Sequence, residues 1–217
     1  MISRFQFISN NTPTHSHLSS IKMALEYGTE WVQLRIKDQP YDEVEIQAIE
    51  ARKICDLYKA KLIINDYPDI ARKCHADGLH LGKTDMEISS ARKIVGRRMI
   101  IGGTANSSED IERLARHQID YIGLGPMRFT YTKKNLSPTL GIEGYKNILN
   151  TLLEKGITIP IIAIGGINTG DIQPLIELGV HGIAVSSLIT ESDNPGETFE
   201  SIFNQIKQGE PYAYHSE

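Results

Sequence analysis

The chain has little cysteine, and it lacks both a long apolar run and an excess of positive charge. Cysteine occurs only twice in 217 residues, as Cys55 and Cys74. The two do not form a close CxxC pair, so we interpret them as reduced, structural thiols in a cytoplasmic protein. No apolar run approaches the roughly 20 residues needed to cross a bilayer, and the first residues lack the apolar segment of a signal peptide. We therefore expect no membrane partner.

The charge balance excludes a strongly basic protein. The chain has 23 Lys and Arg residues against 27 Asp and Glu residues, for a formal net charge of -4. No global positive field is available to attract nucleic acid, so we expect no nucleic-acid partner. An enzyme that acts on anionic small molecules would need local positive charge or a metal ion. The sequence leaves the oligomeric state open, and a homo-oligomer is compatible with it.

Short apolar or β-branched runs alternate with helical patterns along the whole chain. They are runs rather than polar–apolar alternations, which is typical of parallel strands buried on both faces. Eight strand–helix repeats predict an α/β protein of the (β/α)8 TIM-barrel type. We expect one domain over 1–217, with a polar tail at 208–217. The expected strands are Phe5–Ser9, Trp31–Ile36, Lys61–Asp66, Gly78–Gly82, Met99–Thr104, Tyr121–Pro126, Pro160–Gly166 and Gly182–Ser187.

Polar residues at the carboxyl ends of barrel strands are the candidates for a site, because active sites of this fold lie there. Gln33, Arg35 and Lys37 alternate at the end of the second expected strand, so they share one side of it. Two cations that point into a barrel are costly unless they meet an anion. We interpret them as a phosphate or pyrophosphate clamp. The alternative is that Lys37 is an ordinary loop residue.

Two carboxylates follow the next two strands. Asp66 comes after Asn65, and Asp85 follows the strand that contains His80. Together they could share Mg²⁺, which takes one or two carboxylates and completes its shell with water and phosphate oxygens. The alternative is that each aspartate caps the helix that follows it. We expect His80 to be a packed barrel residue rather than a ligand.

The remaining strand ends carry hydroxyls, glycines and a lysine. Thr104 could donate to phosphate or cap the next helix, whereas Arg128 is open to interpretation as a solvated charge. The loops after the seventh and eighth strands often hold phosphate in barrels, because paired glycines let backbone amides approach a ligand. The other candidates for anion contacts are Thr130, Thr132, Lys133, Gly166, Ser186 and Ser187.

Seven motifs stand in order at these strand ends. They are VQLRIKD, IINDYPDIA, ADGLHLGKTD, IIGGTA, DYIGLGPMRFTYTKK, IPIIAIGGIN and HGIAVSS. Over nearly the whole chain, this series resembles the thiamine-phosphate synthase (thiamine-phosphate pyrophosphorylase) family. Its enzymes join a pyrimidine methyl diphosphate to a thiazole phosphate and release pyrophosphate. The resemblance implies a transferase that uses Mg²⁺ and phosphorylated small-molecule substrates.

The resemblance also assigns roles to the candidates. It implies that Asp66 and Asp85 bind Mg²⁺, and that Arg35, Lys37 and Lys133 stabilise the leaving pyrophosphate. Contacts to the pyrimidine diphosphate are implied for Gln33, Arg35, Lys37, Asn65, Thr104 and Lys133. Contacts to the thiazole phosphate are implied for Thr130, Thr132, Gly166, Ser186 and Ser187.

The chain departs from the family pattern at four positions. Tyr67 stands where arginine is common, Lys83 where glutamine is usual, Thr104 in place of serine, and Asn106 where related proteins often carry histidine. Two other functions are considered for this reason. A thiazole tautomerase of the related family needs a proton-transfer group, which Asn106 cannot supply. A non-catalytic barrel that binds thiamine phosphate would keep the phosphate sites without turnover.

Overall fold

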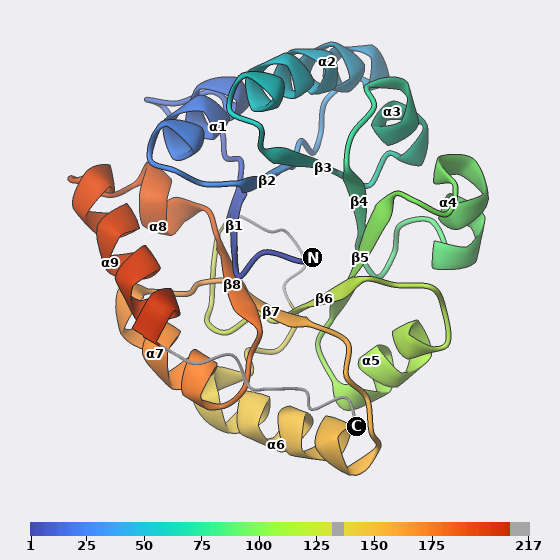
Figure 1. Ribbon diagram of the computed structural model, residues 1–217, viewed down its shortest axis with the longest axis vertical. Coiled ribbons are helices and arrows are strands. Elements are labelled where there is room, and N and C mark those ends of the chain that lie inside the picture. Colours follow the sequence, from blue (N-terminus) through green and yellow to red (C-terminus); the bar gives the residue numbers. More distant parts are fainter. Residues whose placement is uncertain (132–136, 209–217) are drawn as a thin grey trace.

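The computed structural model describes residues 1–131 and 137–208. Within these residues, eight parallel strands close into a barrel in which every strand pairs with its neighbours in the chain and β1 pairs with β8. Helices surround the barrel as an outer ring (Figure 1). The predicted (β/α)8 fold is therefore confirmed.

The elements follow one another in strict alternation until the last strand, after which two helices come in succession. Their bounds are β1 Phe5–Ile8, α1 His17–Glu26, β2 Trp31–Leu34, α2 Tyr41–Leu57, β3 Lys61–Asn65, α3 Pro68–Lys73, β4 Gly78–Leu81, α4 Ile88–Val95, β5 Ile100–Ala105, α5 Ser108–Ala115, β6 Tyr121–Leu124, α6 Gly141–Glu154, β7 Ile161–Ile164, α7 Thr169–Glu177, β8 Gly182–Val185, α8 Ser187–Thr190 and α9 Pro195–Gln208.

The apolar runs form strands because both faces of each strand are buried. On β3, Leu62 and Ile64 face outward and join the core between strands and helices. Ile63, between them, faces inward and packs in a second cluster with Trp31 and Tyr121. A side-chain period of two explains how one continuous apolar run supplies both cores.

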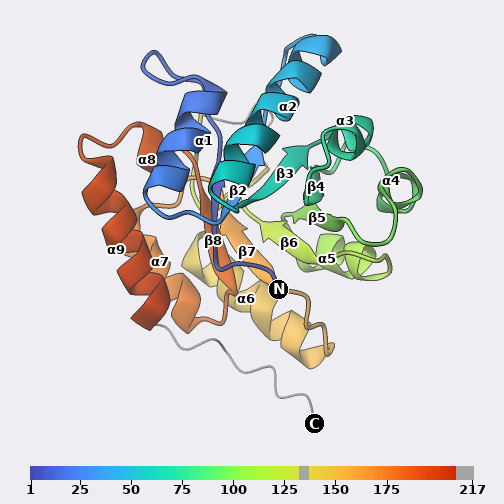
Figure 2. The ribbon, with the colours of Figure 1, turned by 45° about the horizontal axis from the view of Figure 1, so that its top comes forward.

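The N-terminal residues close the amino end of the barrel. Ile2 packs against the inner cluster, and its carbonyl oxygen lies 3.0 Å from Nε2 of His181. At the other end of the chain, α9 packs beside α7 and α8 (Figures 1 and 2). The opposite, carboxyl end of the strands is thus left for the loops that carry the candidate residues.

Strand ends and cysteines differ little from expectation. Most strands end one or two residues earlier than predicted; β2, for instance, ends at Leu34 rather than Ile36. Cys55 and Cys74 are both free and buried, as expected. Burial raises the pKa of the Cys55 thiol to about 12, so it is unreactive at neutral pH. Among the described residues, no helix is both long and apolar enough to cross a membrane.

Candidate active site

Lys37, Asp66 and Asp85 meet at the carboxyl ends of β2, β3 and β4. Nζ of Lys37 lies 2.8 Å from Oδ2 of Asp66 and 3.8 Å from Oδ1 of Asp85. One ammonium therefore contacts two carboxylates from neighbouring strand ends. Because β2 ends at Leu34, Lys37 is a loop residue, yet its side chain belongs to this cluster. The structure thus brings together three of the residues that the sequence singled out.

Neither aspartate caps a helix. The residue at the N-cap of α3 is Tyr67, and that of α4 is Glu87. Instead, Oδ2 of Asp85 accepts a hydrogen bond of 2.7 Å from the backbone N–H of Gly82, which holds the carboxylate in place. Asp66 has a φ of 77°, in the left-handed region that non-glycine residues rarely adopt. Such strained backbone is common at functional sites.

The carboxylates of Asp66 and Asp85 are partly buried and close together, and both facts affect the pKa of Asp85. The pKa of Asp85 is raised, first by burial and further by the neighbouring carboxylate of Asp66, while the Gly82 N–H and Lys37 oppose the shift. Arg35 lies close enough to interact electrostatically with both carboxylates. Burial lowers the pKa of its guanidinium, and Asp85 acts most strongly against that shift.

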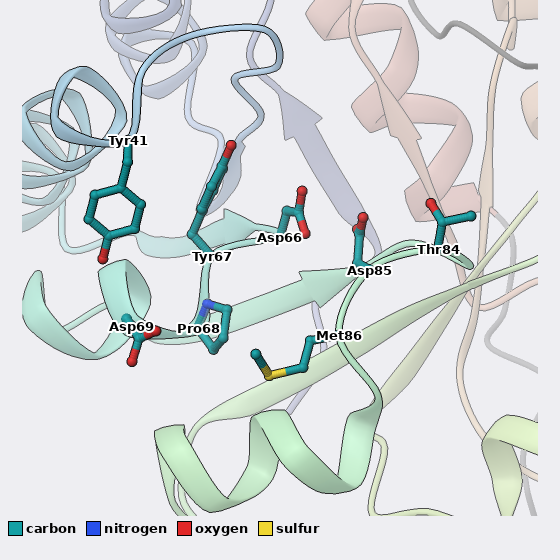
Figure 3. Close-up of a pocket in the computed structure, with 8 residues that line it drawn as sticks. All are labelled: Tyr41, Asp66, Tyr67, Pro68, Asp69, Thr84, Asp85 and Met86. Carbon is teal, nitrogen blue, oxygen red and sulfur yellow. The ribbon is translucent and has the colours of Figure 1, made fainter.

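The carboxylate pair opens onto a pocket of about 620 Å³. Figure 3 shows Asp66 and Asp85 side by side, with Tyr41 and Tyr67 on one side of them and Met86 below. The two tyrosine rings meet edge to face at 6.0 Å between centroids. Tyr67, which stands where the family commonly has arginine, therefore supplies an aromatic wall rather than a charge.

Polar side chains also line the inside of the barrel beneath the cluster. Nε2 of Gln33 donates to Oε1 of Gln6 over 3.3 Å. His80 is buried, as expected, with Nδ1 3.0 Å from the Tyr121 hydroxyl and Nε2 2.9 Å from Oγ1 of Thr104. Thr104 therefore faces the interior and is not the cap of α5, which is Ser107.

At the end of β3, the side-chain amide of Asn65 has a buried donor without a partner among the described residues. Its side chain is buried at 6% exposure, and Nδ2 has no hydrogen-bond partner among the described residues. A buried donor without an acceptor costs about 1–3 kcal/mol, so such groups in native proteins require an explanation. A bound polar ligand at the end of β3 is a physical explanation.

The expected anion site lies at the ends of β6, β7 and β8. Gly166 has a φ of 68°, and a Cβ atom there would come within 2.8 Å of the carbonyl oxygens of Arg128 and Phe129. Only glycine fits this close approach between the turn after β7 and the loop after β6. Thr130 is half-buried in that loop, and Ser186 and Ser187 begin α8 directly after β8. Thr132 and Lys133 lie outside the described residues.

Two ionic contacts around the site were not predicted from the sequence. The Arg128 side chain is exposed, as the sequence suggested, but its charge is paired, because its guanidinium makes two hydrogen bonds, of 3.0 and 2.6 Å, to the buried carboxylate of Asp171. Lys83 lies 2.5 Å from Asp110, so its charge is directed to that carboxylate rather than to Asp66. In both pairs the partners are distant in sequence, so no local sequence pattern could predict these contacts.

The residues present suit a hard divalent cation that takes only one or two of its ligands from the protein. No group of three or more His, Cys, Asp or Glu side chains is arranged to hold a metal within the described part of the chain. Mg²⁺, however, is commonly held by one or two carboxylates together with substrate phosphates. The facing carboxylates of Asp66 and Asp85 meet that requirement, and the contact of both with an ammonium shows that the place attracts positive charge.

Fold and site together define the class: a (β/α)8 barrel with cations and carboxylates at the carboxyl ends of its strands, suited to phosphorylated small molecules. Comparison with known proteins narrows this class. The family model described as Thiamine monophosphate synthase matches residues 5–189. The chain belongs to this family and is a transferase.

Relatives in sequence and in structure agree. The chain is 48% identical to the thiamine-phosphate synthase of Phocaeicola vulgatus over 199 residues, which cover 92% of this chain and 96% of the relative. It is equally 48% identical to that of Bacteroides fragilis, covering 92% and 98% of the two chains. The solved thiamine phosphate pyrophosphorylase of Pyrococcus furiosus superposes with a TM-score of 0.81 at 28% identity, covering 94% of this chain and 96% of that one.

Proposed function

We propose that the chain is a thiamine-phosphate synthase that joins 4-amino-2-methyl-5-(diphosphooxymethyl)pyrimidine to 4-methyl-5-(2-phosphooxyethyl)thiazole. The products are thiamine phosphate and pyrophosphate. The observation that carries this proposal is the meeting of Lys37 with Asp66 and Asp85 at the strand ends, in a chain of this family. Cations beside a carboxylate pair are what a diphosphate leaving group and its metal ion require.

The chemistry is a substitution at the methylene carbon of the pyrimidine. The carbon–oxygen bond to the diphosphate breaks and its electron pair leaves with pyrophosphate. The electron-rich pyrimidine stabilises the methylene cation that remains, and the thiazole nitrogen then forms the new carbon–nitrogen bond. No protein nucleophile is required. The protein's task is to stabilise the negative charge that grows on the leaving group.

Arg35 and Lys37 perform this task among the described residues, and we assign Lys133 the same role. Arg35 lies beside the carboxylates in a partly buried place, where its charge is weakly screened. Asp66 and Asp85 would hold Mg²⁺, which when bound neutralises charge on the diphosphate oxygens. Asn65 offers its unpaired amide to the same oxygens. Gln33 and Thr104, which line the barrel interior below, hold the pyrimidine diphosphate with them.

The thiazole phosphate binds on the other side of the barrel mouth in this proposal. Gly166 keeps the turn after β7 free of a side chain, so backbone N–H groups can approach the phosphate. Hydroxyls of Thr130, Thr132, Ser186 and Ser187 provide the further donors. The two sites thus face each other across the ends of the strands.

A substitution at Asp66 tests the metal part of the proposal. Asp66→Asn suits the left-handed backbone, because asparagine tolerates φ > 0. Losing one charge-stabilising group is expected to lower kcat/KM by about a hundredfold, or roughly 3 kcal/mol in the barrier. The Mg²⁺ concentration for half-maximal rate is expected to rise as well.

Asp69→Asn is the matched control, because Asp69 lines the same pocket but is not in contact with Lys37. We expect it to retain the wild-type rate and Mg²⁺ dependence. Equal losses in the two variants, or an unchanged Mg²⁺ dependence in Asp66→Asn, would contradict the assignment of the metal to this pair.

A further inference from the structure

The side-chain amide of Asn106, just beyond β5, joins the two ends of the connection between β6 and α6. Nδ2 donates to the carbonyl oxygen of Gly125 over 3.0 Å and to that of Pro138 over 2.9 Å. Gly125 directly follows β6, and Pro138 comes shortly before α6. An asparagine amide carries two N–H donors on one nitrogen, and here both are used.

Backbone hydrogen bonds also hold the two ends of this connection together. Leu140 N–H donates to the Pro126 carbonyl over 2.9 Å, and Gly141 N–H donates to the Met127 carbonyl over 3.1 Å. On the opposite side, Arg128 N–H donates to a carbonyl in the turn after β7 over 3.0 Å. The base of the connection is therefore held from the β5 side by Asn106 and from the β7 side by that turn.

Asn106 is itself fixed by a buried carboxylate. Its backbone N–H donates to Oδ2 of Asp110 over 3.0 Å, and the same oxygen lies 2.5 Å from Nζ of Lys83. Lys83 stands two positions before Asp85 in the turn after β4. A continuous series of contacts thus runs from the turn that carries Asp85 to the base of the β6–α6 connection. Lys83 and Asn106, two of the departures from the family pattern, contact the same side chain.

We propose that Asn106 is a positioning residue for the thiazole-phosphate site. By fixing the base of the β6–α6 connection, it sets the place of Thr130 opposite Gly166 without touching either substrate. This inference rests on the proposed function for its kinetic consequence, because Thr130 contacts the thiazole phosphate only in that proposal. The contacts at the base of the connection are independent of it.

The first test is hydrogen exchange of Asn106→Ala, measured without substrates. The amides of Leu140 and Gly141 are expected to exchange at least tenfold faster than in the wild type, because loss of the two hydrogen bonds lets the base open. Asn150→Ala, an exposed asparagine on α6, is the matched control and should leave these rates unchanged. Unchanged exchange at Leu140 and Gly141 in Asn106→Ala would overturn the inference.

The second test is kinetic and separates positioning from general destabilisation. We expect the KM for thiazole phosphate to rise about tenfold in Asn106→Ala. The Mg²⁺ concentration for half-maximal rate should stay unchanged, because Asp66 and Asp85 are intact. The KM of Asn106→His for thiazole phosphate should lie between the values for Asn106→Ala and the wild type, because one ring N–H can replace only one of the two donors.

The outcomes are distinguishable. A KM for thiazole phosphate that does not change in Asn106→Ala would count against the positioning role. A wild-type protein that forms no thiamine phosphate would contradict the proposed function instead, and the exchange comparison would still decide whether Asn106 holds the base of the connection.

Discussion

Replacing Gly166 by alanine is expected to destabilise the protein and to weaken binding at the thiazole-phosphate site. The backbone at this position has a φ of 68°, which costs an L-residue roughly 1 kcal/mol relative to glycine. The new Cβ would also lie 2.8 Å from the carbonyl oxygens of Arg128 and Phe129. These are backbone atoms, and such overpacking typically costs about 1–3 kcal/mol. We expect a loss of about 2–4 kcal/mol in the free energy of unfolding, measured by urea denaturation.

The same substitution has a kinetic consequence. Relief of the clash moves the segment that carries Thr130 away from the turn after β7, so the KM for thiazole phosphate should rise more than that for the pyrimidine diphosphate. Gly170→Ala is the control, because Gly170 lies in α7 and a Cβ there would meet only Asn168 Oδ1 at 3.4 Å. Helix propensity should make that variant neutral or slightly more stable. A loss of stability in Gly166→Ala no larger than in Gly170→Ala would contradict the need for glycine at position 166.

Two further predictions concern buried groups to which no substrate contact is assigned. Burial acts to raise the pKa of Asp171, but hydrogen bonds from Arg128 and the backbone outweigh it, so the pKa is lowered. The stabilisation that Asp171 gives to the folded protein is therefore present above the unfolded-state pKa near 4. It is lost as the pH falls through the lower, folded-state value. Asp171→Asn should therefore cost about 2 kcal/mol at pH 7 and lose less stability than the wild type on acidification, as followed by denaturation at pH 2–7; parallel curves would contradict this assignment. Cys55 and Cys74 should resist iodoacetamide at pH 8 in the native protein and react once it is unfolded, as read by mass spectrometry, because both are buried and burial raises both pKa values; rapid labelling of the native protein would contradict their burial.

The sequence was sufficient to predict the barrel and to single out the residues that form the carboxylate cluster. Each apolar run contains a strand, because short runs of β-branched residues between turn residues suit parallel strands buried on both faces better than helices. Lys37, Asp66 and Asp85 are far apart in the chain, but parallel strands in a barrel place their carboxyl ends together. The fold therefore brings strand-end residues into contact without any further information.

Contacts made by loops could not be predicted in this way. The Arg128–Asp171 ion pair and the two hydrogen bonds of Asn106 depend on the path of the connection between β6 and α6, which no periodicity fixes. Gln6 was missed for a different reason. It is a buried polar residue within an apolar strand, and its inward register on β1 was the signal that could have identified it as the partner of Gln33.

In the proposed function, the site couples release of pyrophosphate to formation of thiamine phosphate. The most direct measurement incubates the purified protein with both substrates and Mg²⁺ and quantifies the two products in the same samples, with a parallel reaction in which EDTA removes the metal. We predict one pyrophosphate for each thiamine phosphate, and neither product with EDTA. Failure to form thiamine phosphate from both substrates in the presence of Mg²⁺, or pyrophosphate release without it, would contradict the proposed function.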